Sequence, residues 1–435
     1  MITSTSRLLP PRSAIAWLGS VEFLPDALNG LTEAGNQSRS SFNACPNMTW
    51  HLITSEYPPQ VGGVSDYSRL IAEGLAEAGD DVHVWCPSQS AGTAGQRVKI
   101  HPELGRIGPH DLRALDCLLD KFAPPRRLLV QWVPHGFGWH SMNLPFCLWV
   151  HRRARRGDRI ELMVHEPYLE FGAGRVYHAL TAATHRLMTA VLLNASSHVW
   201  IAIPAWERYL RPYTLGRRVP FTWLPIPSAV RPGEVGDIAA IRGKYAGEGG
   251  LVGHFGTFSP ATSRLLRDRL PGVLTGRPAV ALLLAGAGSE TLRAELIETC
   301  PEIADRVHAL GFVSFDKLGA YLTACDLCVQ PYPDGISSRR TTAMSCLSLG
   351  IPIVTTRGHL TEALWRESEA VSLAEVADPG EFTREALRLL NDEPGRRGLG
   401  ERARRLYDRH FSATRIIDAL RLSEGVSLGV SPSIG

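Results

Sequence analysis

A strand, a glycine turn, a helix and a second strand follow one another near residue 50, and this unit constrains the fold more than any other feature. The run His51–Ser55 reads as a strand, and Gly62-Gly63 forms the turn after it. Apolar residues at 3.6-residue spacing then predict a helix over 65–78. The segment Asp81–Cys86 alternates as the next strand. A strand–helix–strand unit of this length implies a parallel sheet in an α/β fold.

The same rhythm restarts near Leu251, so the sequence predicts two domains of one architecture. A chain of 435 residues is also longer than a single compact core usually holds. We expect the boundary between Pro225 and Gly250. The predicted parts are 1–47, a disordered leader or a mis-assigned start with Met48 as the true one; 48–228, a Rossmann-like domain; 250–411, a second Rossmann-like domain; 412–422, a terminal helix; and 423–435, a flexible tail.

Composition excludes several classes of protein. A net charge of +3 indicates no nucleic-acid-binding surface, and no run of about 18 apolar residues exists to span a membrane. The close pair Cys325 and Cys328 has no second pair to complete a zinc site, so reduced core thiols are the simpler interpretation. Such thiols are typical of the cytoplasm, which is the location we expect.

Four turns at predicted strand ends carry residues suited to an anionic ligand. They are Gly62-Gly63, Ala285–Ser289, Gly311–Val313 and Asp334–Arg340. Glycines let backbone N–H groups approach an anion, and a helix N-terminus adds a partial positive charge. None is the dinucleotide fingerprint, which disfavours NAD. In the last turn two hydroxyls and two guanidiniums precede a helix, which favours an anion such as a diphosphate.

Two strand ends in the first half carry further candidates. His165 and Glu166 follow a buried strand, at the end where α/β folds bind ligands. The loop 131–140 is rich in aromatic residues and glycines, and aromatic faces stack on sugar rings. Ordinary packing explains that loop equally well.

The ordered set of motifs resembles the GT-B glycosyltransferases, especially the retaining family 4. The motifs read Tyr-Pro-Pro-x-x-Gly-Gly-Val, Leu-x-Ala-Gly-x-Gly, Gly-Phe-Val-Ser, Asp-x-x-Val-x-Pro and Gly-Ile-Pro-Ile-Val, and they span roughly Met48 to Phe411. The resemblance implies two Rossmann-like domains, with the donor nucleotide on the second and the acceptor on the first. It also implies that His165 lies beside the donor sugar and that the terminal helix crosses back to the first domain.

The chain departs from the family at the donor site. The family has an arginine and a lysine after the first strand of its second domain, where this chain reads Gly253–Ser259 without either. The family's paired glutamates fall on Ser337 and Ser345, or the first falls on Asp334 if three residues are inserted. We expect Thr257 and two arginines, Arg339 and Arg340, to compensate, whereas Arg264 and Arg267 lie too far along a helix.

The resemblance implies transfer of a sugar from a nucleoside diphosphate sugar to an acceptor hydroxyl with retention of configuration, the leaving phosphate taking the acceptor proton. Because the chain has no Asp-x-Asp motif, we expect neither a metal nor a cofactor. The catalytic candidates are His165 and Glu166. The donor candidates are Gly62, Gly63, Thr257, Gly286, Gly288, Gly311, Phe312, Val313, Asp334, Gly335, Ser337, Ser338, Arg339 and Arg340. The acceptor candidates are Tyr57, Asp66, His135, Phe137 and Trp139.

Three alternatives stay open at this point. A non-catalytic GT-B relative could bind a nucleotide or a protein partner, and a GT-B sugar-nucleotide epimerase would share the architecture. The dense basic run His151–Arg159 is either a solvated helix end or a docking patch for an anionic lipid. In the second case Arg153–Arg159 would hold the protein at the inner face of a membrane, near a lipid-linked acceptor.

Overall fold

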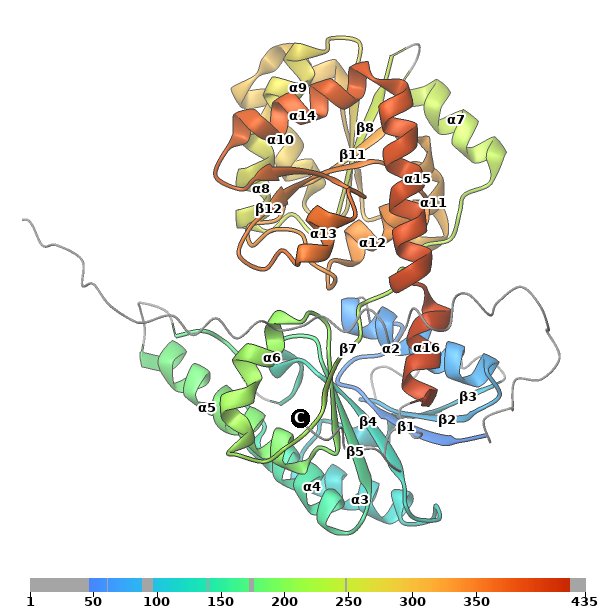
Figure 1. Cartoon of the computed structure of the whole chain (residues 1–435), viewed down its shortest axis with the longest axis vertical. Coiled ribbons are helices and arrows are strands. Elements are labelled where there is room, and N and C mark those ends of the chain that lie inside the picture. The colour runs from blue at the N-terminus through green and yellow to red at the C-terminus, as the bar shows by residue number, and fades with distance from the viewer. Residues whose placement is uncertain are drawn as a thin grey trace, which may run out of the picture. The chain divides into compact units, whose positions relative to one another are not determined.

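The computed structural model describes residues 47–60, 62–87, 97–138, 141–171, 176–246 and 249–422. The predicted leader and the predicted tail therefore lie outside the described residues. Residues 47–435 form one compact unit. It contains two parallel β-sheets, each covered by helices (Figure 1).

The N-terminal sheet has seven strands in the order β3-β2-β1-β4-β5-β6-β7. All its strand pairs are parallel. The order reverses between β1 and β4, which is the switch point where doubly wound sheets bind ligands. The strands are β1 Thr49–Ile53, β2 Asp81–Trp85, β3 Val98–His101, β4 Arg127–Trp132, β5 Arg159–Val164, β6 His198–Ile201 and β7 Phe221–Trp223.

The C-terminal sheet has six strands in the equivalent order, β10-β9-β8-β11-β12-β13. Its strand pairs are also parallel, so both sheets gather the carboxyl ends of their strands at one edge. The strands are β8 Leu251–Phe255, β9 Ala281–Ala285, β10 Val307–Gly311, β11 Leu327–Gln330, β12 Ile353–Arg357 and β13 Ser372–Glu375.

Helices connect the strands and bury their apolar faces on the sheets. Those of the N-terminal domain are α2 Gly63–Glu77, α3 Pro109–Leu119, α4 Leu144–Arg155, α5 Val176–Ala195 and α6 Ala205–Leu210. Those that follow are α7 Val235–Tyr245, α8 Pro260–Arg267, α9 Leu270–Gly276, α10 Ser289–Thr299, α11 Phe315–Ala324, α12 Thr341–Ser348, α13 Ala363–Glu367, α14 Pro379–Asn391, α15 Glu393–His410 and α16 Ala413–Leu422. Short 3-10 turns lie at Pro102–Leu104, Pro134–Gly136, Arg211–Thr214 and Pro301–Arg306.

The segment between the predicted domains is a helix rather than a bare linker. Helix α7 packs against α11. A side chain at Gly319 would lie 1.8 Å from the carbonyl oxygen of Arg231, so glycine permits this close approach. Residues 235–245 therefore belong structurally with the C-terminal domain.

The last helix, α16, packs against α2 of the N-terminal domain (Figure 1). Ile416, Ile417 and Leu420 are buried in the same apolar cluster as the face of α2. Arg127 on β4 donates from Nη2 to the carbonyl oxygen of Leu420 at 2.8 Å, and from Nε to the buried carboxylate of Glu161 at 2.7 Å. The end of the chain thus completes the core of the domain at its beginning.

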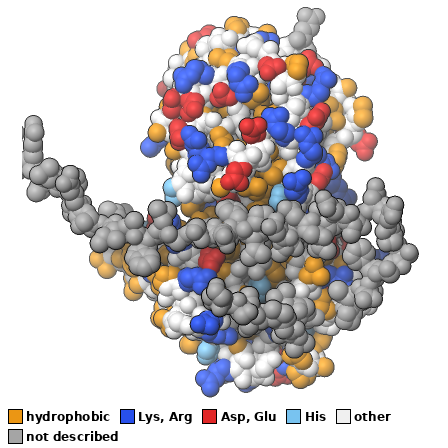
Figure 2. Space-filling view, in the orientation of Figure 1, with side chains coloured by type: hydrophobic (Ala, Val, Ile, Leu, Met, Phe, Trp, Pro, Cys, Tyr) orange, Lys and Arg blue, Asp and Glu red, His pale blue; other side chains and the backbone are white. Residues whose placement is uncertain are grey.

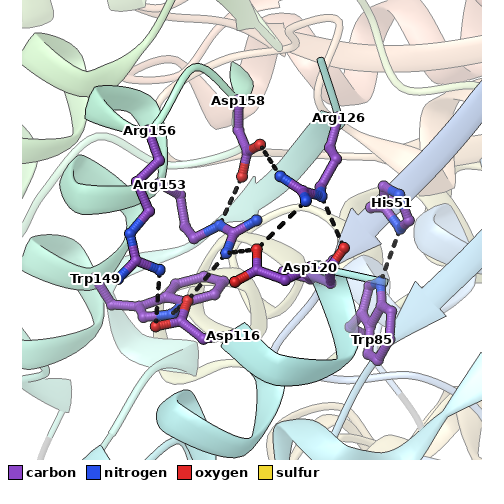
Figure 3. Close-up of polar contacts among 10 residues, drawn as sticks. His51, Trp85, Asp116, Asp120, Arg126, Trp149, Arg153, Arg156 and Asp158 are labelled. Atoms are coloured by element: carbon purple, nitrogen blue, oxygen red, sulfur yellow. Dashed lines mark hydrogen bonds and ion pairs between the residues drawn. The ribbon is translucent and has the colours of Figure 1, made fainter. Parts of the chain in front are cut away.

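The basic run at the end of α4 is mostly structural, as Figure 3 shows for Arg153 and Arg156. Arg153 is fully buried, and its guanidinium lies 2.6 Å from Asp158 and 2.7 Å from Asp120. Arg126 also contacts Asp158, at 3.0 Å. Arg159 lies 3.0 Å from the buried Glu161. The hypothesis that the whole run Arg153–Arg159 faces a lipid is therefore wrong for Arg153, which is fully buried, whereas Arg155 and Arg156 are exposed.

We predict that Arg153→Ala lowers the free energy of unfolding by about 3–5 kcal/mol, because it leaves the buried Asp158 without its closest partner. The neighbouring substitution Arg152→Ala removes the same charge from an exposed position and should change stability by less than about 0.5 kcal/mol. Urea unfolding of both variants measures the difference. Equal stabilities would show that the network contributes nothing.

Candidate functional site

The carboxyl edge of the C-terminal sheet is built from glycine turns that touch one another. Gly286, after β9, has a φ of +134°, and a side chain there would lie 1.9 Å from the carbonyl oxygen of Gly256 after β8. Gly286 also donates its N–H to the carbonyl of Gly311 at 2.7 Å. Only glycine allows these three backbones to meet, so they form a surface that a ligand can approach closely.

Aromatic and hydroxyl side chains border this surface. Gly288 is the N-cap of α10 with a φ of +92°, and the Phe258 side chain packs against it. Phe312 is 64% exposed, although large aromatic residues are usually buried. Thr257 is also exposed, and Val313 is half-buried. An exposed ring at a strand end offers a stacking face for a planar group.

Two arginines meet one carboxylate at the start of α12. Arg339 lies 2.5 Å from Asp334, and Arg340 contacts the other oxygen of the same carboxylate. Arg339 also lies 3.3 Å from Glu166 of the N-terminal domain. The structure thus joins Arg339 and Arg340 through Asp334, and Arg339 to Glu166. The sequence predicts that Asp334 binds the donor. In the structure its carboxylate contacts the two arginines instead, and its negative charge would repel a diphosphate.

The two serines of the same turn are buried rather than open to a ligand. Ser338 is 1% exposed, and its hydroxyl lies 2.9 Å from the carbonyl of Ala202 and 2.5 Å from Glu362. Trp223 donates from Nε1 to the same hydroxyl at 3.0 Å. Ser338 therefore joins the two domains, and its predicted role as a donor ligand is wrong. Ser337 is fully buried, and its hydroxyl has no hydrogen-bond partner among the described residues.

Gly335 shapes the turn and does not face a ligand. Its φ is +86°, and a side chain there would lie 2.3 Å from the backbone nitrogen of Gly358. The carboxylate of Glu362, which sequence reasoning missed, supports the same turn from the other side. It accepts hydrogen bonds from the backbone of Ser338 at 2.8 Å and from Trp365 at 2.7 Å. Burial raises the pKa of Glu362 above its usual value.

His165 stands directly after β5 and is buried. Its Nε2 donates to Oε1 of Gln131 at 2.9 Å, and its ring packs edge-on against Tyr67 at 4.8 Å. Burial lowers the pKa of His165 to about 3, so the ring is neutral at ordinary pH. With the proton on Nε2, Nδ1 keeps a lone pair and makes no hydrogen bond within the part of the chain that the structure describes. The histidine is thus a neutral hydrogen-bonding group, fixed by Gln131.

The turn before α2 already holds a carboxylate. A side chain at Gly62 would lie 2.1 Å from Oε2 of Glu56, while Gly63 is exposed with open space around it. Asp66 lies half-buried in the first turn of the same helix. Burial raises the pKa of Glu56, and the nearby Asp66 raises it further. The helix N-terminus that was assigned to a donor phosphate therefore faces the chain's own acidic group.

Two of the acceptor candidates are core residues. Tyr57 is 4% exposed and belongs to the apolar cluster beneath α2, and Phe137 is fully buried between Trp132 and Phe146. Both acceptor predictions are wrong because these rings fill the interior. His135 is exposed and lines a cavity of about 490 Å³ together with Glu56, Ser55, Gln60, Val133 and Gly136. Trp139 lies outside the described residues.

A second histidine at the donor edge was not predicted from the sequence. His254 on β8 donates from Nδ1 to the carbonyl of Val329 at 2.8 Å, so its buried Nε2 carries a lone pair. That atom has no partner among the described residues, and it lies beside the turn at Gly256. Burial lowers the pKa of His254 to about 4. The sequence signal was available, because His254 lies in the segment Gly253–Ser259, where the family's cations are missing.

A cavity larger than the one at His135 lies away from this chemistry. It measures about 850 Å³ and is lined by the residues that precede β8, β9, β11 and β12, together with arginines of α15. These are the amino ends of the strands, opposite the glycine turns, and its arginines are mostly paired with acidic side chains or backbone carbonyls. We therefore place the candidate site at the carboxyl edge. Among the described residues, no cluster of histidine, cysteine, aspartate or glutamate could hold a metal ion.

Comparisons with known proteins bear on the C-terminal domain and on the fold. Residues 250–392 match the family model described as glycosyl transferases group 1. No curated protein matches the chain.

Several solved structures share the fold. Sucrose-phosphate synthase from Thermosynechococcus elongatus is 19% identical with a TM-score of 0.66, covering 88% of this chain and 99% of its own. HepE from Anabaena, solved with UDP and glucose, is 15% identical with a TM-score of 0.62, covering 87% and 99%. A trehalose-6-phosphate protein from E. coli, bound with UDP-2-fluoro glucose, is 10% identical with a TM-score of 0.62, covering 88% and 99%.

The strand order, the glycine edge and the family match lead to one assignment. The two predicted Rossmann-like domains are confirmed, and the matched segment is the domain whose carboxyl edge carries the arginines and glycine turns. The protein has the GT-B fold, and its residues 250–392 match the family model described as glycosyl transferases group 1.

Proposed function

We propose that the protein transfers a glycosyl group from a nucleoside diphosphate sugar, with UDP as the first nucleotide to test, to an acceptor hydroxyl. The observation that carries the proposal is the contact of Arg339 with Glu166 of the other domain, in a C-terminal domain whose carboxyl edge also carries the glycine turns and Arg340. The choice of UDP rests on similar structures that were solved with UDP and glucose or with UDP-glucose.

Different residues would hold the base, the diphosphate and the sugar of the donor. Phe312 offers a stacking face for the base, and the backbones of Gly286, Gly288 and Gly311 allow close approach. Arg339 and Arg340 would leave Asp334 to meet the diphosphate, since charge-assisted bonds from guanidinium to phosphate are among the stronger ones. Thr257 is exposed beside this path and would add a hydroxyl.

The transition state needs charge stabilised on the leaving diphosphate more than it needs a carboxylate nucleophile. His165, neutral because of its burial, would orient sugar hydroxyls through Nδ1. Glu166 would orient the acceptor or accept from the donor sugar once Arg339 turns toward phosphate. We propose retention of configuration by front-face attack, in which the bond from the anomeric carbon to phosphate breaks, the acceptor oxygen bonds that carbon, and the leaving phosphate takes the acceptor proton.

The reaction as proposed uses neither a metal nor a cofactor. The positive charge near the diphosphate would come from Arg339 and Arg340, and partial charge from the N-terminus of α12. Asp66 and His135 would serve the acceptor, and the cavity lined by Glu56 and His135 supports the assignment of His135.

Peripheral contact with a membrane is the finer part of the proposal. Within the described part of the chain, no helix is long and apolar enough to cross a bilayer. With Arg153 buried, the arginines of the basic run that could meet a lipid headgroup are the exposed Arg152, Arg155 and Arg156. A lipid-linked acceptor at the inner face of a cell membrane is consistent with that arrangement.

A non-catalytic relative is the second candidate function. The observation that favours it is the ion pairing itself, because Arg339 and Arg340 both have an internal counter-ion in the ligand-free protein. Such a protein would bind a nucleotide without transferring sugar.

Incubation with UDP-, GDP- and dTDP-sugars, followed by measurement of released nucleotide, tests the function. Transfer or slow hydrolysis of one donor supports the enzyme. Binding of a donor without turnover under varied acceptors favours the non-catalytic protein, and interconversion of the free donor would indicate an epimerase. If no donor binds, the proposal fails.

We predict that Arg339→Ala/Arg340→Ala weakens donor binding by about 3 kcal/mol, because two charge-assisted hydrogen bonds of at least ~1.5 kcal/mol each are lost. Isothermal titration with the preferred donor measures it. The matched control is Arg397→Ala/Arg405→Ala, which removes two exposed arginines of α15 at the opposite edge. Unchanged donor affinity in the first variant would refute the assignment of these arginines.

We predict that Asp334→Asn strengthens donor binding several-fold, because the carboxylate competes with the diphosphate for both guanidiniums. The same titration measures it, with a thermal melt to follow stability. Weaker donor binding in a folded variant would mean that Asp334 itself contacts the donor, as the sequence comparison suggested.

A further inference from the structure

Helix α5 presents an apolar face that the rest of the described chain does not cover. Val176 is 86% exposed, Leu180 57% and Leu187 52%, and Ala179 and Ala183 are exposed between them. These five residues, here called the α5 face, follow the spacing of one helical stripe. The opposite side of the helix buries residues such as Met188 and Leu192 in the core. The helix is therefore apolar on both sides.

Neighbouring side chains extend the α5 face. Phe171 is 59% exposed and Tyr177 51%, and the guanidinium of Arg186 lies 3.9 Å from the centre of the Phe171 ring. Leu148, on the adjoining helix α4, is 48% exposed. In Figure 2 hydrophobic side chains gather at the left edge of the view, where Figure 1 draws the start of α5. Contiguous exposed apolar surface of this kind marks a binding face.

Charge around the α5 face is mostly positive. Helices α4 and α5 and the segment 211–220, which packs against the end of α5, contain no acidic residue. They carry seven arginines, at 152, 153, 155, 186, 211, 217 and 218, of which 153 is buried. Two acidic residues lie beside them: Glu170 is exposed next to Phe171, and Glu207 pairs with Arg211. Leu215 is 76% exposed. An apolar stripe bordered by an excess of cations is the pattern of a helix that lies in the interface of an anionic bilayer.

The position of the helix fits such a surface. Helix α5 follows Glu166 in the chain, so its first turns lie toward the carboxyl edge of the N-terminal sheet, on the side of the candidate site. A second copy of this chain would also cover an apolar stripe. It would bring the same arginines together across a two-fold interface, however, and like charges repel.

We propose that the α5 face, with the exposed arginines of α4 and of 211–220, docks on an anionic lipid bilayer. The inference deepens the proposed function, because an acceptor carried by that bilayer would lie on the side of the site, but docking itself needs no donor. Apolar side chains would enter the headgroup boundary, while arginines meet lipid phosphates.

Flotation of the full-length protein with vesicles tests the proposal. We expect at least tenfold tighter binding to vesicles of phosphatidylcholine with 30% phosphatidylglycerol than to phosphatidylcholine alone, weakening as salt is raised. Leu180→Glu/Leu187→Glu should reduce binding to the anionic vesicles at least tenfold. The matched control is Val235→Glu on α7, where an equally exposed apolar residue, 83% exposed, gains the same charge far from α5 in the sequence.

Three results would overturn the proposal: no binding of the wild-type protein to either vesicle, equal binding of wild type and Leu180→Glu/Leu187→Glu, or a wild-type dimer that this variant converts to monomer. Light scattering after gel filtration measures whether the wild type and the variant are dimers or monomers. A thermal melt checks folding, and Leu180→Ser/Leu187→Ser repeats the comparison if the glutamates disturb the helix. Donor titration without vesicles is measured separately, so loss of docking and failure of the transferase function give different results.

Discussion

The hydroxyl of Ser338 is the contact on which the arrangement of the site depends. It lies within hydrogen-bond reach of Ala202 and Trp223 in the N-terminal domain and of Glu362 in the C-terminal one. A hydroxyl has one proton, so it cannot donate to both the Ala202 carbonyl and a carboxylate. Burial raises the pKa of Glu362, and a protonated Glu362 would donate to Ser338 and free its proton for Ala202. The next residue in the chain is Arg339, which that contact holds opposite Glu166.

The donor edge combines a fixed part and a part that must rearrange. The glycine turns are packed so tightly that any side chain at Gly286 would collide with the backbone of Gly256. The two arginines, by contrast, are held only by side-chain contacts, chiefly with Asp334. An internal carboxylate keeps two adjacent cations from repelling each other while no ligand is bound. When a diphosphate binds, the arginines therefore exchange Asp334 for the diphosphate as their counter-ion. The affinity for the donor is set by the difference in free energy between these two pairings.

Periodicity predicted most of the fold, because parallel strands buried on both faces read as apolar runs and the connecting helices repeat at 3.6 residues. Periodicity did not predict the edge strands β3 and β13, because Val98–His101 and Ser372–Glu375 are short and partly polar. At the site, the residues Arg339, Glu166 and Gly286 could be found from the positions of strand ends. The burial of Tyr57, Phe137 and Ser338 could not, because an aromatic ring or a hydroxyl in a turn looks the same in sequence whether it faces a ligand or the core. Glu362 lies 24 residues from Ser338, and only the folded chain brings them together.

The docking of α16 on α2 has a consequence for how the protein is made. Ile416, Ile417 and Leu420 fill the core next to α2, and Arg127 bonds to the carbonyl of Leu420, 293 residues later in the chain. A ribosome makes that helix only after both sheets. Part of the apolar core of the N-terminal domain therefore stays open to solvent until α16 has been synthesised and can pack against α2.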